Sequence, residues 1–228
     1  MQGGSRIVSF FFATKVESEL IKKELKKKSE NSIGNLLYTI GKLGKYEIVL
    51  CITGIGKVNA AISSTIAFQN LPIKKALISG IAGAYPNSGL NIGEIVVAQK
   101  EINADEGLLR TCNDHPNSFL FLSIEEINLE IPQSLRKLKK GTFLTVSSCT
   151  GNLKRANFLE RKFNAVCENM EGFAIAKAAQ YFNIPTMEIR AISNFVKSRR
   201  RLLSPIEIKK ASEIMQKFII ENISSLMV

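Results

Sequence analysis

Two glutamates occupy positions where a buried carboxylate could take part in chemistry. Glu17 opens a helical pattern directly after an apolar run, and Glu171 lies in Asn169-Met170-Glu171-Gly172, just before an unusually apolar helix. The helix dipole favours an acid in a first turn, and this explanation alone accounts for Glu17. Glu171 is different, because an unpaired carboxylate at the edge of a core is costly. We therefore expect Glu171 to have a hydrogen-bonding partner, such as the diol of a ligand.

Three further turns place small or polar residues where a strand ends. They span residues 53–61, residues 79–85 with the strand that follows, and residues 190–194. Glycines at positions 54 and 56 let a backbone approach a ligand closely, although the spacing fits neither a Walker loop nor a dinucleotide fingerprint. Tight packing explains the small residues after Ser79 equally well. Ligands of α/β sheets lie beyond the carboxyl ends of the strands, so these turns are expected to share one cleft.

Alternating apolar runs and amphipathic patterns predict the elements that position these residues. Strands alternating with helices indicate one layered α/β domain, residues 1–228, with a largely parallel sheet. Residues 108–140 are the least regular stretch and are expected to form a loop-rich excursion at one edge. The predicted strands are 6–13, 46–53, 75–82, 93–100, 142–147 and 184–193, and the predicted helices are 15–29, 56–70, 152–162, 170–182 and 205–225.

The charge is unbalanced, with 31 Lys and Arg against 20 Asp and Glu, a net +11. Nucleic acid, an anionic membrane or an anionic small molecule would each suit a basic protein. However, much of the excess lies in lysine runs at 22–23 and 26–28, on what is predicted to be the outer face of a helix. No basic stretch is interleaved with aromatics, so nucleic acid is not the expected partner.

The remaining composition argues against metals and membranes. Four cysteines are scattered without a CxxC pair, and His115 is the only histidine, so no structural zinc site is expected. Scattered thiols are typical of a cytoplasmic protein. The run 7–13 after Arg6 is short and lacks a cleavage site, and it is better explained as a buried strand than as a signal peptide. No apolar run reaches the ~20 residues of a membrane span.

Together, residues 53–61, 79–98, 169–172 and 190–194 resemble the purine nucleosidase/phosphorylase superfamily. The nearest resemblance is to methylthioadenosine/S-adenosylhomocysteine nucleosidases and to their relatives, the futalosine hydrolases. It runs through most of the chain and weakens across 108–140. It implies a three-layer αβα fold around a central mixed, largely parallel sheet. It also implies cleavage of a purine nucleoside without metal or cofactor, in a homodimer.

The resemblance assigns roles to matching positions. Glu17 corresponds to the carboxylate that positions and deprotonates the attacking water. Glu171 corresponds to the acid that binds the ribose hydroxyls, and Met170 to the residue that packs under the sugar. The other residues implied to bind substrate are Asn169, Ser79, Gly80, Ile81 and Ala82. Asp105-Glu106-Gly107 also matches the family, although a surface turn would explain it too.

Asn194 falls where methylthioadenosine nucleosidases carry an aspartate that addresses the purine. A carboxyl group suits a 6-aminopurine, whereas an amide supplies N–H to O6 of a 6-oxopurine and a carbonyl to a protonated N7. Stabilising N7 promotes departure of the base, so Asn194 is a predicted catalytic residue. The hypoxanthine of futalosine fits this pattern, and hydrolysis would release hypoxanthine and dehypoxanthine futalosine in a menaquinone route.

Two further comparisons bear on the nucleophile and on the rest of the substrate. Superfamily phosphorylases bind phosphate through arginines, but Leu77-Ile78 stands where one is expected and the first turn offers only Lys15, which favours water. Arg199 and Arg201 match a Pro-Arg-x-Arg stretch of futalosine hydrolases and are predicted to bind the benzoate carboxylate. A solvated basic loop is the alternative. Other open readings are a methylthioadenosine/S-adenosylhomocysteine nucleosidase, a 6-oxopurine nucleoside phosphorylase and a non-catalytic nucleoside-binding protein.

Overall fold

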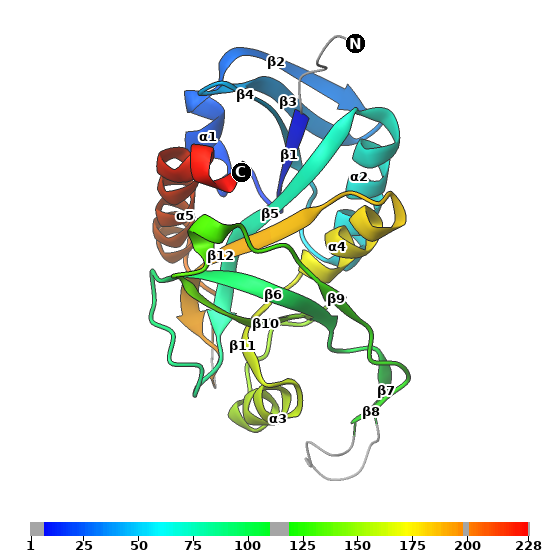
Figure 1. The fold of residues 1–228 in the computed structure, drawn as a ribbon. Coiled ribbons are helices and arrows are strands. Elements are labelled where there is room, and N and C mark those ends of the chain that lie inside the picture. Colours follow the sequence, from blue (N-terminus) through cyan, green and yellow to red (C-terminus); the bar gives the residue numbers. More distant parts are fainter. Residues whose placement is uncertain (1–6, 110–118, 198–200, 228) are drawn as a thin grey trace.

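The computed structural model describes residues 7–109, 119–197 and 201–227, and its centre is one curved sheet (Figure 1). The strands run in the order β11-β10-β6-β12-β5-β1-β4-β3-β2, with β9 beside β6, while β7 and β8 form a separate hairpin. Their bounds are β1 (Ile7–Phe12), β2 (Lys26–Ile33), β3 (Leu36–Leu43), β4 (Tyr46–Ile52), β5 (Ile73–Ala84), β6 (Ile95–Asn103), β7 (Gly107–Leu109), β8 (Phe119–Phe121), β9 (Glu126–Asn128), β10 (Lys139–Thr145), β11 (Ala165–Asn169) and β12 (Thr186–Phe195).

The sheet is mixed, with a parallel centre. β5 pairs parallel with β1 on one side and with β12 on the other, and β1 pairs parallel with β4. β12 is antiparallel to β6, and the last residues of β5 also pair antiparallel with β11. This second pairing curls the sheet and brings the ends of β5, β11 and β12 together.

Helices cover both faces of the sheet, as alternating side chains of a buried strand require. Phe10 and Phe12 of β1 contribute to one core, which also holds side chains from α1 (Glu19–Glu24) and α5 (Pro205–Leu226). Phe11 points to the other core, under α2 (Lys57–Asn70) and α4 (Gly172–Tyr181). α3 (Leu153–Phe163) packs beside β11, and a short 3-10 helix spans Gln133–Leu135. The three-layer αβα prediction is confirmed.

The predicted helix over residues 15–29 is wrong beyond Glu24. The lysine run 26–28 lies in β2, an exposed strand at the edge of the sheet, instead of on a helix face. Both faces of β2 are wet, so its sequence lacks the apolar alternation that would reveal a strand, and edge lysines discourage further pairing. β3 and β11 were also not predicted, and the expected loop-rich excursion contains β8 and β9. No described helix has both the length and the apolar character needed to cross a membrane.

Candidate active site

Glu17 lies in the turn after β1 and is almost completely buried, with 4% of its surface exposed. Its Oε2 accepts hydrogen bonds from the backbone N–H and the hydroxyl of Thr14, both at 2.9 Å. Its Oε1 accepts the backbone N–H of Ile81 at 3.1 Å. The carboxylate is therefore fixed between its own turn and the middle of β5.

Gly80 allows this approach. Its φ is +148°, and a Cβ there would lie 2.5 Å from Glu17 Oε1 and 3.0 Å from Arg190 Nη1. Both contacts are closer than side chains normally allow, and the backbone angle itself is one that favours glycine. Gly80 thus marks the point on β5 where the carboxylate and the guanidinium converge.

Glu171 is the N-cap of α4 and is also buried. Its Oε1 accepts the backbone N–H of Gly56, at 2.9 Å, from the turn between β4 and α2. Its Oε2 lies 3.8 Å from Arg190 Nη1. The structure thereby brings Gly56 and Glu171 together beside Arg190, which also contacts the segment of β5 that holds Glu17.

Sequence reasoning assigns no role to Arg190, although this residue opens the motif 190–194. Its signal in the sequence is a basic side chain in the middle of a strand, β12, that is buried along most of its length, and Arg190 itself is 2% exposed. Burial alone would lower the pKa of Arg190, but the carboxylates of Glu188, Glu171 and Glu17 raise it, so the guanidinium remains charged. Burial raises the pKa of Glu17, and the charge of Glu171 adds to this while Arg190 opposes it.

The remaining residues of the β5 turn form a backbone framework. Ile81 supplies its N–H to Glu17 and its carbonyl to Arg190 Nη1 at 3.3 Å. The Ser79 hydroxyl donates to the Ile189 carbonyl at 3.0 Å, within the sheet. The carbonyl of Ala82 accepts the Ser193 hydroxyl at 3.1 Å. These predicted substrate residues thus lie within β5, where Ile81 and Ala82 contribute backbone atoms and Ser79 its hydroxyl.

Asn169 and Met170 precede Glu171. The Oδ1 of Asn169 accepts the backbone N–H groups of Glu171 at 2.9 Å and of Gly172 at 2.7 Å, so it fixes the start of α4. Met170 is partly exposed, and its sulfur lies 3.5 Å from that of Cys149.

Asn194 lies at the end of β12 beside β5, and a Cβ on Gly83 would approach its Nδ2 to 3.1 Å. Its Oδ1 accepts the Ser193 hydroxyl at 2.9 Å, and its Nδ2 donates to the Phe195 carbonyl at 3.1 Å. The side chain also lines a hollow of about 310 Å³ together with Lys197 and Arg201. Glu17 and Asn194 therefore adjoin the same segment of β5.

Arg201 is exposed and pairs with Glu207 through both terminal nitrogens, at 2.7 and 3.1 Å. Glu207 also accepts the backbone N–H of Ser204 in the capping box that begins α5. Arg199 lies outside the described residues. Arg201 is thus at the hollow beside Asn194, but its guanidinium group is already bonded to the carboxylate of Glu207.

Asp105 lies near α2. Its Oδ1 is 2.6 Å from Lys57 Nζ, and its Oδ2 accepts the backbone N–H of Ser147. Lys57 Nζ also donates to Asn103 Oδ1 at 2.8 Å. This ion pair joins the start of α2 to the end of β6.

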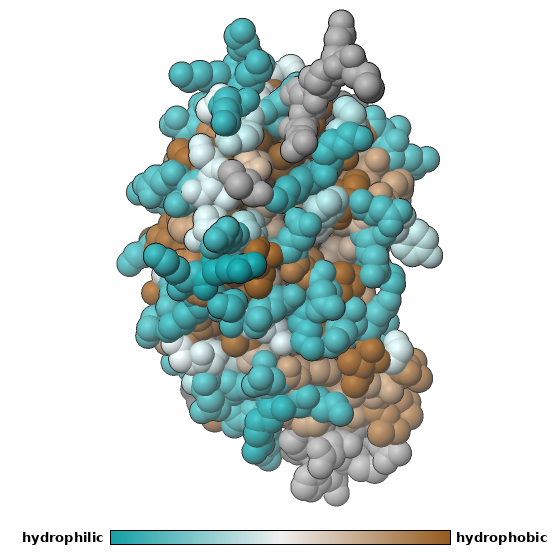
Figure 2. All heavy atoms as spheres, viewed as in Figure 1, coloured by the Kyte–Doolittle hydropathy of each residue, from teal (hydrophilic) through white to brown (hydrophobic). Residues whose placement is uncertain are grey.

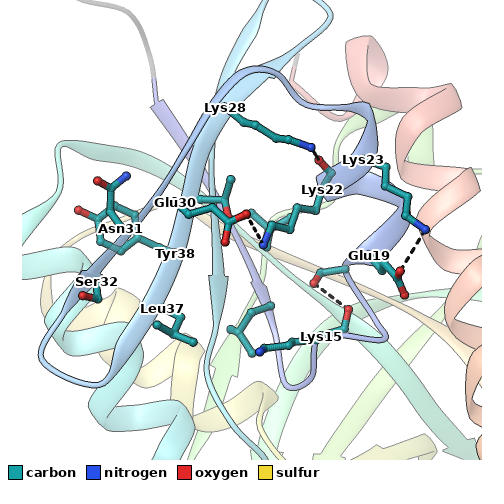
Figure 3. A pocket seen from close by; sticks show the side chains of 14 residues that line it. Lys15, Glu19, Lys22, Lys23, Lys28, Glu30, Asn31, Ser32, Leu37 and Tyr38 are labelled. Carbon is teal, nitrogen blue, oxygen red and sulfur yellow. Dashed lines mark hydrogen bonds and ion pairs between the residues drawn. The ribbon is translucent and has the colours of Figure 1, made fainter.

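A second, larger hollow of about 760 Å³ lies between α1 and the β2–β3 hairpin (Figure 3). Four lysines line it, but Lys22 pairs with Glu30 and Lys23 with Glu19, each at 3.0 Å. Neither Glu17 nor Glu171 is among its lining residues. The lysine-rich surface is therefore partly neutralised and separate from the carboxylate site.

Comparisons with known proteins bear on the fold and the family of this chain. The methylthioadenosine/S-adenosylhomocysteine nucleosidase of Staphylococcus aureus is 26% identical over 215 residues, covering 90% of this chain and 94% of that protein. The Streptococcus pyogenes S-adenosylhomocysteine nucleosidase with 5-methylthiotubericidin has a TM-score of 0.82 at 21% identity, covering 100% of both chains. The Neisseria meningitidis 5'-methylthioadenosine/S-adenosylhomocysteine nucleosidase with methylthio-immucillin-A has a TM-score of 0.80 at 19% identity, covering 96% of this chain and 99% of the other. These structural likenesses confirm the fold. The sequence profile of the phosphorylase superfamily matches residues 11–222, so the chain belongs to the phosphorylase superfamily.

Proposed function

We propose that this protein hydrolyses the N-glycosidic bond of a purine nucleoside, and that its substrate is futalosine. The observation that carries the proposal is the convergence of two buried carboxylates, Glu17 and Glu171, on Arg190 beside Gly80. The relatives named as nucleosidases support the reaction type.

The two carboxylates have different tasks. Glu171 Oε1 is bonded to a backbone N–H, and its remaining lone pairs are suited to accept the ribose hydroxyls. Glu17 orients a water and takes its proton as the C1′–N9 bond breaks through an oxocarbenium-like state. The raised pKa of Glu17 makes it a stronger base than an exposed glutamate, which improves proton transfer near neutral pH.

Asn194 is proposed to recognise the base. Its Nδ2 uses one N–H on the Phe195 carbonyl and its Oδ1 uses one lone pair on the Ser193 hydroxyl. An amide carries two N–H groups and two lone pairs, so one N–H remains for O6 of hypoxanthine and one lone pair for a protonated N7.

The 5′ side of futalosine carries a benzoate, and the proposed partners are Arg199 and Arg201. Arg201 shows that a guanidinium at this hollow can hold a carboxylate through two hydrogen bonds, since it holds Glu207 in this way. A substrate carboxylate would have to replace or join Glu207. If Arg199→Ala and Arg201→Ala both leave the Michaelis constant for futalosine unchanged, this assignment is wrong.

We further propose a cytoplasmic homodimer. Exposed apolar side chains gather on and just after the β7–β8 hairpin, at Leu108, Leu120, Leu122 and Ile124. Figure 2 shows hydrophobic residues over the part of the surface where Figure 1 places β7 and β8. Exposed apolar groups that cluster in this way favour a protein partner, and sedimentation velocity would give the mass of the assembly.

A methylthioadenosine/S-adenosylhomocysteine nucleosidase is the second candidate, and the name of the Staphylococcus aureus relative favours it. The purified protein should be incubated separately with futalosine, S-adenosylhomocysteine, methylthioadenosine and inosine, each with and without phosphate. Release of hypoxanthine from futalosine, independent of phosphate, is expected. Release of adenine from the thio-nucleosides would instead establish the second candidate, and a requirement for phosphate would establish a phosphorylase.

A further inference from the structure

Two carboxyl groups lie side by side behind Arg190. Glu101 belongs to β6 and Glu188 to β12, its antiparallel neighbour, and both are 0% exposed. The two carboxyls are neighbours, because an oxygen of each would crowd a Cβ placed on Gly172. A Cβ on Gly172 would overlap Glu101 Oε1 and come within 2.7 Å of Glu188 Oε1. The glycine after Glu171 therefore leaves the space that the acid pair occupies.

A hydrogen bond between two carboxyl groups requires that one of them keep its proton, because carboxylates only accept. Two adjacent anions in a dry interior would also repel each other strongly. Glu188 Oε1 accepts from the guanidinium of Arg190 at 2.8 Å, which makes Glu188 the charged member and Glu101 the neutral one. Burial and the charge of Glu188 also raise the pKa of Glu101 well above its usual range. Glu188 Oε2 has no other donor among the described residues. The proton of Glu101 is the donor that fits it.

The charged member, Glu188, is connected to the active site by its hydrogen bond with Arg190. Glu188 Oε1 accepts from Arg190 Nε at 2.8 Å. The opposite edge of the guanidinium then donates to the Ile81 carbonyl and lies 3.8 Å from Glu171. One buried anion thus fixes which edge of the arginine faces the site.

The neutral member, Glu101, is connected to the active site by a second set of hydrogen bonds. Glu101 accepts from Asn169 Nδ2 at 2.5 Å and from the Thr145 hydroxyl at 2.8 Å. Asn169 Oδ1 then binds the N–H groups of Glu171 and Gly172, and the Thr145 oxygen accepts the N–H of Phe173 at 2.7 Å. The first turn of α4 is therefore bonded to residues that Glu101 orients.

We propose that Glu101 and Glu188 are positioning residues that share one proton, hold Arg190 against Glu171 and fix the start of α4. Their effect on catalysis rests on the proposed function, whereas the shared proton does not. Besides Arg190 and Glu171, the titratable group facing the pair is the buried thiol of Cys167 on β11. With one proton shared, the pair carries a single negative charge, which the guanidinium balances.

Whether the acid pair holds a proton can be tested without any substrate. Infrared spectra of the wild-type protein and Glu101→Gln, both at neutral pH, should differ by the carbonyl band of a protonated carboxyl that only the wild type shows. The difference spectrum separates Glu101 from other buried acids. A wild-type protein without this band would overturn the proposal, even if no nucleoside were hydrolysed.

The positioning role is tested by an asymmetry between variants. Glu101→Gln keeps an N–H donor toward Glu188 but only one of the two acceptor oxygens of Glu101, so it should lower kcat much less than Glu188→Gln does. Glu188→Gln removes the anion that holds Arg190 and should lower kcat on the order of 100-fold, the usual effect of displacing a catalytic group by about 1 Å, with KM less affected. Glu160→Gln, a buried acid on α3 that binds Asn87 away from the site, is the control.

Equal effects of Glu101→Gln and Glu188→Gln, or a loss of thermal stability with unchanged kcat, would overturn the positioning role. If Glu188→Gln does not fold, Glu101→Leu replaces it. Leucine lacks both the donor and the acceptor that glutamine keeps, so Glu101→Leu should lower kcat further than Glu101→Gln does. Failure of the wild type to hydrolyse any nucleoside would refute the proposed function and leave the infrared result to decide the shared proton.

Discussion

Glu17 combines features that a general base requires. Two elements hold its oxygens by three hydrogen bonds, and burial raises its pKa while Arg190 keeps the anionic form accessible. A carboxylate held only for structure would be expected to have all its lone pairs occupied or to be paired directly with a cation. Glu17 retains one lone pair, because a carboxylate can accept up to about four bonds.

Replacing Glu17 with glutamine should therefore abolish most of the activity while the fold survives. The amide keeps the size of the side chain but cannot take a proton, so kcat should fall by roughly two orders of magnitude or more. Steady-state hydrolysis of futalosine measures this. Glu19→Gln is the matched control, since Glu19 lies two residues away, is exposed and pairs only with Lys23. Near-normal turnover of Glu17→Gln would remove it from the mechanism.

Asn194→Asp tests base recognition at the same scale. A carboxylate would repel O6 of hypoxanthine and accept from the amine of adenine, so kcat/KM for hypoxanthine nucleosides should fall relative to that for adenine nucleosides. A mismatch of buried polar groups costs about 1–3 kcal/mol, which corresponds to roughly 5- to 150-fold in the ratio. Competition between inosine and methylthioadenosine measures it directly. An unchanged preference would show that Asn194 does not recognise the base.

Residues with a local signature could be predicted from the sequence, and those defined by long-range contacts could not. Glu171 was expected to need a partner because it precedes an apolar helix, and its partners are indeed Gly56 and Arg190. Glu101 and Glu188 appear as single acids in apolar strands, and only the pairing of β6 with β12 makes them a pair. Sequence alone does not specify that register.

At the scale of elements, α5 holds the turn that carries Glu17. Gln216 on α5 is 0% exposed, and its Oε1 accepts the N–H of Leu20 at 2.7 Å and of Ile21 at 3.3 Å. Its Nε2 donates to the Val16 carbonyl at 3.0 Å. One amide thus caps the start of α1 and holds both ends of the segment around Glu17. α1 has only six residues and no side-chain cap of its own, so this support comes from α5.

Gln216→Ala should lower both stability and turnover. It leaves buried backbone donors of α1 unsatisfied, at a cost of about 1–3 kcal/mol in the free energy of unfolding. Because the turn with Glu17 loses its anchor, kcat should fall more than KM rises. Thermal unfolding and steady-state kinetics measure the two effects.

Gln180→Ala is the matched control for this change, because Gln180 is an exposed glutamine near the end of α4 whose side chain accepts a hydrogen bond from Lys177. A variant at Gln216 that unfolds at a lower temperature but keeps the wild-type kcat would show that α5 supports the fold without positioning Glu17.

The short elements also explain which parts of the fold were predictable. The strands of the centre, such as β1 and β5, are buried on both faces and appear as continuous apolar runs. β2 is exposed along nearly its whole length, and its pairing with β3 is its only distinguishing feature. Its lysines therefore predict a helix from the sequence alone, whereas pairing with β3 makes this segment a strand.

At the scale of the whole molecule, two electrostatic effects oppose each other as the pH changes. The net charge of +11 at pH 7 and a pI near 9.6 mean that raising the pH reduces repulsion between surface charges. Buried acids act in the opposite sense. Burial raises the pKa of Glu17, Glu101 and Glu188 in or next to the carboxylate site, and that of Glu168, which binds Tyr85.

The buried acids should dominate, so that the protein becomes less stable as the pH rises above the unfolded pKa of glutamate and through the raised folded pKa values of these carboxyls. A carboxyl whose folded pKa lies above its unfolded value, about 4.3 for glutamate, contributes stability that is complete below the unfolded value and is lost as the pH rises through the folded value. Each proton involved contributes a slope of roughly 1.4 kcal/mol per pH unit. Chemical denaturation at a series of pH values measures the slope, and Glu101→Gln should make it shallower because one of these protons is gone. If stability instead increased steadily toward the pI, surface repulsion would outweigh the acids, and the shared proton behind Arg190 would not influence the stability of the fold.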